Sequence, residues 1–104
     1  MKKTPLKRIG KVGEANLKAN RILARRWKEL GVEACEIGLP GCTITWPLQN
    51  VHRHKRYWYH GDYRLLSSYW QVVRGCQHCH ETIENDENLT EEVFNRLRGE
   101  DPLT

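Results

Sequence analysis

The chain contains the sequence Cys76-Gln77-His78-Cys79-His80 and, closer to the N-terminus, a second cysteine pair with six residues between its members. Two separated pairs supply four thiolates, which is enough for a closed tetrahedral zinc site. The Cys-x2-Cys spacing is typical of such sites, and the glycines and proline between the members of the first pair allow that wider loop to turn back. We therefore predict a structural zinc bound by Cys35, Cys42, Cys76 and Cys79.

A metal site also suits the length of the chain. A domain of 104 residues buries only about 60 to 65% of the surface that its unfolded chain exposes, so an added source of folding energy is expected. Two alternatives to a zinc site made of all four cysteines remain at this point. The four cysteines could be reduced core residues, or His54 or His78 could belong to the zinc ligands.

Length and hydropathy exclude several classes of protein. A chain of 104 residues has no room for a large two-domain enzyme. Its apolar runs are far shorter than the roughly 20 residues that cross a bilayer, and Met1-Lys2-Lys3-Thr4-Pro5 is not followed by the apolar segment of a signal peptide. We expect a cytoplasmic protein with no membrane partner, in which thiols stay reduced and bind metal rather than form disulfides.

Charge is segregated along the sequence. Residues 1–28 carry ten basic residues and one acid, whereas residues 81–104 carry eight acids and two basic residues. A basic N-terminal segment together with a basic patch in the middle of the chain is typical of a protein that binds nucleic acid, although a solvated helix face and a flexible tail would give the same pattern. With DNA as the expected partner, the candidate contacts are Lys18, Arg25, Arg26, Arg53, Lys55 and Arg56.

The coarse order of elements indicates an α+β fold. Apolar residues at helical spacing predict a basic helix over 14–30 that ends near Gly31, preceded by a flexible basic arm over 1–13. We expect residues 14–104 to form one domain. Its other predicted elements are a small hairpin of strands 43–46 and 49–54 bent at Pro47, a loop over 55–67, short helices over about 68–73 and 80–85, and a C-terminal helix capped by Thr90.

If zinc occupies the cysteines, the histidines need a separate role. On a strand, His52 and His54 would share one face, and on a helix His80 and Glu84 would share another. Both pairs could then meet in one cleft, where some of these groups bind a divalent cation and a remaining histidine acts as general base on water. Alternatively, His52 and His54 belong to a basic nucleic-acid patch and His80 supports the zinc site.

This ordered set resembles HNH endonucleases, also called the His-Me finger or ββα-metal family, and most closely their small phage and prophage branch. The resemblance covers roughly residues 33–86. It is carried by the Cys-x6-Cys opening Cys-Glu-Ile-Gly-Leu-Pro-Gly-Cys, by Val51-His52-Arg53-His54-Lys55-Arg56 at the end of a hairpin, and by Cys76-Gln77-His78-Cys79-His80 followed by Glu84.

The resemblance implies a small, zinc-stapled ββα-metal domain that hydrolyses phosphodiester bonds in DNA with one divalent ion such as Mg²⁺, Mn²⁺ or Ni²⁺. It also implies a phage or prophage protein that acts in the cytoplasm of a bacterial host cell. By position, His52 matches the general base and His80 a ligand of the catalytic metal, with Glu84 as a further ligand. Lys55 and Arg56 would contact phosphates. An exchange of roles, with His54 as base and His52 as ligand, stays open.

The sequence departs from the family pattern at two positions. Val51 stands where many members have a metal-binding Asp or His, and Gln71 stands near the position of a central Asn. These departures favour an alternative function, a catalytically degenerate zinc module that binds DNA or a protein partner. A third hypothesis is a structural protein whose acidic C-terminal helix contacts a basic partner.

Overall fold

The computed structural model describes residues 11–45 and 47–103, which form an α+β arrangement of four α-helices, two 3-10 helices and one two-stranded sheet. In chain order the elements are α1 (Lys11–Leu30), β1 (Leu48–His52), η2 (Arg56–Tyr59), α2 (Tyr63–Leu66), η3 (Tyr69–Gln71), β2 (Val72–Cys76), α3 (Gln77–Glu84) and α4 (Glu87–Arg98).

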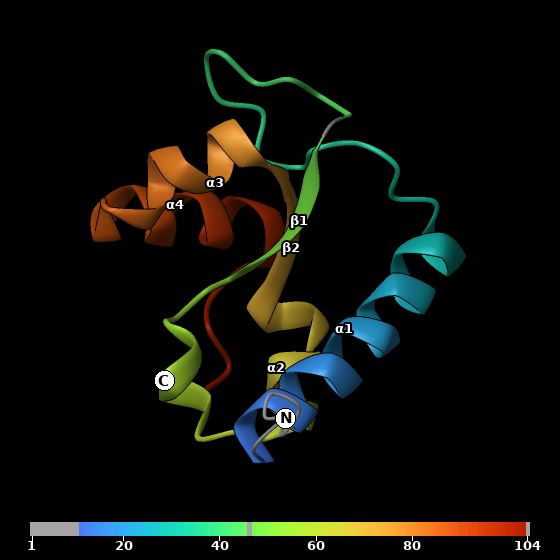
Figure 1. Cartoon of the computed structure of the whole chain (residues 1–104). Helices are drawn as coiled ribbons and strands as arrows, with labels where there is room; N and C mark the ends of the chain where they lie inside the picture. The colour runs from blue at the N-terminus through green and yellow to red at the C-terminus, as the bar shows by residue number, and fades with distance from the viewer. Residues whose placement is uncertain (1–10, 46, 104) are drawn as a thin grey trace, which may run out of the picture.

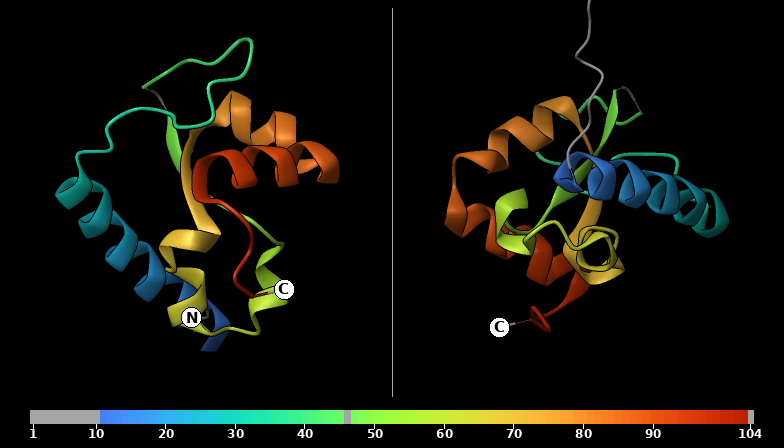
Figure 2. Two further views of the ribbon diagram at one scale, coloured as in Figure 1. Left: turned by 180° about the vertical axis from the view of Figure 1, so that it is seen from behind. Right: turned by 60° about the horizontal axis from the view of Figure 1, so that its bottom comes forward.

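The sheet lies at the centre of the molecule. β1 and β2 are antiparallel, with a register that runs from Leu48 opposite Cys76 to His52 opposite Val72. Helix α1 lies on one side of the sheet, and α3 and α4 lie on the other (Figure 1; Figure 2). The segment between the two strands, residues 53–71, contains η2, α2 and η3 and extends beyond one end of the sheet.

The predicted hairpin between residues 43–46 and 49–54 is wrong. Trp46 lies outside the described residues, and residues 43–45 form no strand. Ile44 has a φ of 71°, in the left-handed region that extended backbone cannot use. The partner of β1 is instead β2, which begins at Val72.

The predicted helix over about 68–73 is also wrong beyond its first turn. Residues Tyr69–Gln71 form a single 3-10 turn, and Val72 and Val73 then continue as strand. Both valines are fully buried. Because successive strand residues point to opposite faces, two adjacent buried β-branched residues fit a strand that is covered on both sides.

The two faces of the sheet belong to different hydrophobic clusters. Val51 and Val73 lie opposite each other in the register and pack in a cluster with Ile83 and Phe94 of α3 and α4. Val72 packs on the other side of the sheet with the α1 residues Leu23 and Trp27. The Trp27 indole N–H also donates to Asn50 Oδ1 at 2.7 Å, which ties α1 to β1.

Helix α1 begins at Lys11, so the last residues of the predicted arm over 1–13 are helical, while residues 1–10 lie outside the described part of the chain. Its buried stripe repeats every fourth residue, at Ala15, Ala19, Leu23 and Trp27. The small alanines let the N-terminal half of α1 approach a cluster that contains Tyr59 and Leu66. The expected stop at Gly31 is confirmed by a φ of 71° and a hydrogen bond from the Gly31 amide to the Lys28 carbonyl oxygen.

Helix α4 begins earlier than predicted, because the side chain of Asp86 and not that of Thr90 caps it by accepting a hydrogen bond from the Leu89 amide. Its last turn is tied to the cysteine-bearing loop by Arg98, whose guanidinium donates to both carboxylate oxygens of Glu36 at 2.8 and 3.0 Å. After α4 the chain turns at Gly99 and runs toward η2 (Figure 2).

Within the described ranges, no helix combines the length and the apolar character that a bilayer crossing requires.

Candidate functional site

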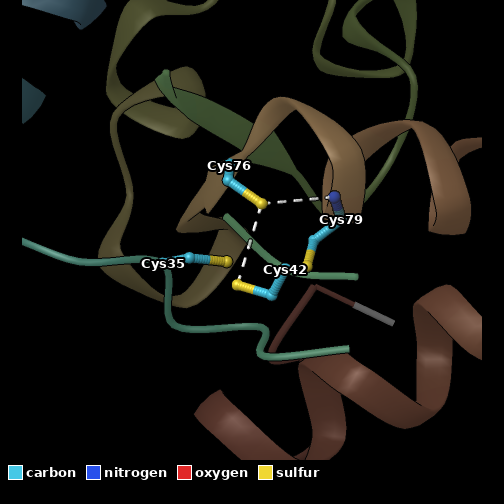
Figure 3. A group of neighbouring side chains, drawn as sticks. All are labelled: Cys35, Cys42, Cys76 and Cys79. Carbon is cyan, nitrogen blue, oxygen red and sulfur yellow. Dashed lines mark hydrogen bonds between the residues drawn. The ribbon is translucent and has the colours of Figure 1, made fainter. Parts of the chain in front are cut away.

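The four cysteines come together from two parts of the chain. Cys76 ends β2 and Cys79 lies in the first turn of α3, whereas Cys35 and Cys42 lie in the loop between α1 and β1 (Figure 3). Two backbone hydrogen bonds place this loop: Cys35 N–H donates to the Ile44 carbonyl oxygen at 2.6 Å, and Glu36 N–H donates to the Arg74 carbonyl oxygen of β2 at 2.8 Å. As a result, the four sulfur atoms all lie within 4.8 Å of one another.

The dimensions of this cysteine cluster suit a tetrahedral metal ion. Zinc–sulfur bonds of about 2.3 Å imply sulfur–sulfur separations of about 3.8 Å at the edges of a tetrahedron. Cys76 Sγ and Cys42 Sγ are 3.8 Å apart, and the four cysteines are free rather than joined in disulfides. The four cysteines could therefore hold a metal ion such as zinc.

Backbone amides also point at the sulfur atoms. The Leu39 amide donates to Cys79 Sγ, the Ile44 amide to Cys42 Sγ and the Cys79 amide to Cys76 Sγ, at 3.4, 3.2 and 3.4 Å. Such donors stabilise the thiolate form that binds metal, and they fix the orientation of each ligand.

The cysteines differ in how easily they ionise. Burial opposes ionisation of Cys76, yet hydrogen bonds from the Cys79 amide and from Thr43 lower its pKa to about 5. Burial raises the pKa of Cys79 to about 12. Because four adjacent thiolates repel one another, their joint ionisation requires a cation among them.

His78 covers the loop of the cysteine cluster but is not among its sulfur ligands. Its Nε2 donates to the Pro40 carbonyl oxygen at 2.7 Å. Gly41 has a φ of 88°, and a Cβ at that position would lie 2.5 Å from His78 Nε2. Across residues 11–45 and 47–103, the four cysteines are the only group of three or more His, Cys, Asp or Glu side chains that lie close enough together to hold a metal ion, which argues against a zinc site completed by His54 or His78.

A second feature is a cleft of about 950 Å³ beside the C-terminal end of β1. The sequence predicted that four side chains could meet in one cleft, and His52, His54, His80 and Glu84 all line this one. Lys55 and Arg56 line it as well, from the segment that follows β1. We refer to it below as the histidine cleft.

His52 is held as a neutral base. Its pKa is lowered to about 4, chiefly by burial and to a smaller extent by the nearby charge of Arg56, while a hydrogen bond to Leu66 opposes the shift. This bond joins His52 Nε2 to the Leu66 carbonyl oxygen at 2.8 Å. A carbonyl oxygen can only accept, so Nε2 carries the ring proton and Nδ1 keeps its lone pair.

His54 has a different partner. β1 ends at His52, so the two histidines do not share a strand face as predicted. His54 Nε2 lies 2.6 Å from Asp101 Oδ2, and the His54 ring stacks on Trp58 with 4.0 Å between ring centroids. The carboxylate and the indole together fix both the position and the tautomer of the His54 ring.

Buried polar groups hold Asp101 in turn. Gln71 Nε2 donates to Asp101 Oδ1 at 2.6 Å, and the Tyr59 hydroxyl donates to Gln71 Oε1 at 2.8 Å. Burial raises the pKa of Asp101, but hydrogen bonds with His54, the Leu103 amide and Gln71 outweigh it and leave the pKa below its usual value. Asp101 is therefore an ionised acceptor at neutral pH.

His80 and Glu84 form a pair on α3. His80 Nδ1 lies 2.7 Å from Gln49 Oε1, an acceptor, so Nδ1 carries the proton and Nε2 is left with its lone pair. His80 Nε2 lies 3.7 Å from Glu84 Oε1. A histidine whose other ring nitrogen donates to an oxygen is the usual form of a metal-binding histidine.

The six predicted nucleic-acid contacts have different surroundings. Lys55 and Arg56 are exposed in the cleft. Arg53 is 8% exposed, and its guanidinium donates to the Trp70 carbonyl oxygen and to Asn95 Oδ1, so it joins structural elements and does not fit the predicted phosphate contact. Three lie on α1, away from the cleft: Arg25 is exposed, Arg26 donates to the Ser67 carbonyl oxygen, and Lys18 lies over the Tyr63 ring.

Several residues of the cleft could not be found from the sequence. Asp101 lies 47 positions from His54, in the acidic C-terminal segment that the sequence suggested only as a contact for a basic partner. Gln49 lies 31 positions from His80 and belongs to no ligand motif. Of the residues that contact these histidines, only Trp58 could be suspected from the sequence, because it is an aromatic residue four positions after His54.

A comparison with protein-family models, with curated proteins and with solved structures found no match.

Proposed function

We propose that the protein is a metal-dependent DNA endonuclease of the HNH type. The observation that supports this proposal best is the histidine cleft, in which His52, His80 and Glu84 lie with the cations Lys55 and Arg56. A neutral base, a pair of possible metal ligands and two phosphate-binding cations are the groups that phosphodiester hydrolysis needs.

In the proposed reaction His52 is the general base. It is neutral at pH 7 because burial lowers its pKa to about 4. Its Nδ1 lone pair takes a proton from the attacking water, and the Leu66 carbonyl oxygen holds the Nε2 proton and the orientation of the ring. Because this base is weak, it acts by its position beside the scissile phosphate more than by its affinity for protons.

His80 and Glu84 would hold a divalent ion such as Mg²⁺, Mn²⁺ or Ni²⁺, with Gln49 orienting His80. When bound, such an ion stabilises negative charge on the phosphate and on the leaving oxygen. Lys55 and Arg56 bind the neighbouring phosphates. His54 contacts the substrate through Nδ1, because Asp101 occupies its Nε2.

The cysteine cluster would carry zinc as a structural ion. The cysteine cluster positions Cys79, and therefore also His80, the next residue of α3, against β1. Stability and chemistry are thus assigned to separate metal sites.

A second candidate function is a zinc module that binds DNA without cleaving it. One observation favours it: in the described ranges, no third His, Cys, Asp or Glu side chain joins His80 and Glu84 within metal-binding distance. A divalent ion would then depend on water and phosphate oxygens for its remaining ligands, as Mg²⁺ commonly does.

Nicking of supercoiled plasmid and cleavage of single-stranded circular DNA test the proposal. We expect cleavage by the zinc-loaded wild type with Mg²⁺, Mn²⁺ or Ni²⁺, none when these ions are left out, and a loss of at least about 100-fold in His52→Ala. His60→Asn is the matched control, since His60 is exposed, does not line the cleft and has a left-handed backbone that asparagine tolerates.

Cleavage by His60→Asn but not by His52→Ala would support the endonuclease and its base. Equal cleavage by both would contradict the role of His52. Metal-independent DNA binding without cleavage by any of the three proteins would favour the binding module.

A further inference from the structure

Three consecutive aromatic residues, Tyr57, Trp58 and Tyr59, have three different environments. Tyr59 is fully buried, and its hydroxyl donates to Gln71. Trp58 is half-buried against the His54 ring. Tyr57 is 80% exposed, although it lines the histidine cleft. Packing therefore accounts for two of the three rings and leaves the Tyr57 ring at the surface of the cleft.

The backbone at Tyr57 is nevertheless well defined. It belongs to η2, which is anchored on one side by buried Tyr59 and closed by a hydrogen bond from the His60 amide to the Tyr57 carbonyl oxygen. When a ligand stacks on this ring, little backbone freedom remains to be lost, and the ordering cost is confined to the two side-chain torsions of the tyrosine.

Cations lie directly beside this ring. Lys55 is the N-cap of η2 and Arg56 is its first residue, and both side chains are exposed and line the cleft. One short element thus presents two positive charges and an aromatic face. Proteins that bind single-stranded nucleic acid combine these two features, because cations follow the phosphates and aromatic rings stack on the bases.

The other wall of the cleft carries the opposite charge. α3 and α4 contribute Glu84, Glu87 and Glu91 to its lining. A duplex brings two phosphate backbones, and one of them would lie near these carboxylates. A single strand has one backbone, which can stay on the side of Lys55 and Arg56 while its bases turn toward Tyr57.

We propose that Tyr57, with Lys55 and Arg56, forms a stacking surface for an unpaired nucleobase, so that the histidine cleft takes single-stranded DNA in preference to duplex. This inference rests on the proposed function in that both make DNA the ligand of the cleft. It adds the form of the DNA and the side chain that recognises it.

Fluorescence anisotropy with labelled oligonucleotides, on zinc-loaded protein in buffer free of EDTA and of added Mg²⁺, Mn²⁺ or Ni²⁺, tests this surface without any cleavage. The probes are a 20-nucleotide single strand, the duplex of the same sequence and a single strand whose central nucleotides are abasic. Wild type is compared with Tyr57→Ala, Tyr57→Phe and Trp70→Ala. Trp70 is the matched control, because it is also an exposed aromatic residue, at 50%, but does not line the cleft.

We expect wild type to bind the single strand more tightly than the duplex. Tyr57→Ala should weaken binding to the single strand by about tenfold, as loss of one base–aromatic stack does. Tyr57→Phe, which keeps the ring, and Trp70→Ala should bind like the wild type. On the abasic strand Tyr57→Ala and wild type should bind alike. Circular dichroism should show the same fold for all four proteins, since Tyr57 is exposed.

The inference is overturned if Tyr57→Ala binds the single strand as tightly as wild type does, if wild type prefers the duplex, or if wild type binds neither. Its failure is distinguishable from that of the proposed function. Tyr57-dependent binding without cleavage in Mg²⁺ would keep the stacking surface and remove the nuclease. If the wild type cleaves DNA and Tyr57→Ala binds the single strand as tightly as the wild type, the nuclease is kept and the stacking surface is removed.

Discussion

The cysteine cluster and the histidine cleft meet at one short unit, the turn from β2 into α3, but they are built in opposite ways. The cluster gathers four identical ligands within 4.8 Å of one another. The cleft is open, and its three histidines have three different partners: a backbone carbonyl for His52, a carboxylate for His54 and an amide for His80.

From this difference we assign stabilisation of the fold to the cysteine cluster and interaction with a ligand to the histidine cleft. Identical ligands in a closed set suit an ion that contributes folding energy. Differently partnered histidines in an open cleft differ in tautomer and in readiness to accept a proton, which suits chemistry on a bound molecule. The predictions below test this division, beginning with the largest expected effect.

Removal of one cysteine ligand should unfold the protein. Structural zinc contributes about 10 to 16 kcal/mol in small zinc domains, which exceeds the total stability of most domains of this size. We expect Cys79→Ser to lose both zinc, measured by native mass spectrometry, and helical circular dichroism. Chelation of zinc from the wild type should have the same effect. A zinc-free Cys79→Ser protein with the native spectrum would show that the cluster is not a structural metal site.

Acid should destabilise the protein partly through His52. Its pKa is about 4 in the folded protein, against 6.5 in the unfolded chain. Between these values the unfolded state binds more protons, so this contribution is complete above about pH 6.5 and falls as the pH decreases toward 4, by up to about 3 kcal/mol. Urea unfolding of wild type and His52→Asn across this range should give a steeper loss in the wild type. Parallel curves would contradict the assignment of His52 as a half-buried neutral base.

In the cleft, Asp101→Asn should slow DNA cleavage by about 10- to 100-fold with little loss of stability. Asparagine can still accept from Gln71, but its amide would donate to His54 and reverse the ring tautomer. Cleavage rates and the ¹⁵N shifts of the His54 ring measure this effect. Glu100→Gln, the same change at the neighbouring acid of the cleft, is the control. If both variants cleave at the wild-type rate, Asp101 has only a structural role.

The smallest expected effect concerns the loop of the cysteine cluster. Gly41 and Gly38 both have positive φ, but only at Gly41 does the added Cβ meet the His78 ring. Gly41→Ala should therefore cost about 1 kcal/mol more stability than Gly38→Ala, roughly the value of the hydrogen bond that His78 must give up. Equal losses in urea unfolding would show that His78 moves aside freely.

The sequence predicted the cysteine cluster better than the cleft, for a physical reason. Metal ligands must be of a few residue types and come in short spacings, so Cys76 and Cys79 could be recognised locally. The α+β class and the extent of α1 also follow from local patterns. Strand pairing does not, because β1 pairs with a segment that lies beyond three intervening helical turns, and Val72 and Val73 fit a buried helix as well as a strand.

Within the cleft, the residues that could be chosen from the sequence were those with reactive side chains, such as His52 and His80. The groups that set their chemistry could not. A backbone carbonyl such as that of Leu66 leaves no mark in the sequence, and Asp101 comes close only because α4 and the turn at Gly99 direct the chain back to η2. For Arg53 the sequence predicted a role that the structure does not favour. Its basic side chain suggested a phosphate contact, but its buried guanidinium donates hydrogen bonds to Trp70 and Asn95 and so joins structural elements.

The central claim, that the cysteine cluster serves stability and the histidine cleft serves catalysis, is tested most directly by the cleavage rate of His80→Ala measured on protein of known zinc content. His80 directly follows Cys79, so the two roles lie one residue apart. We predict one zinc per chain, a native circular dichroism spectrum and a loss of cleavage of about 100-fold or more. Wild-type cleavage by zinc-loaded His80→Ala, or loss of zinc together with cleavage, would contradict this separation of the two sites.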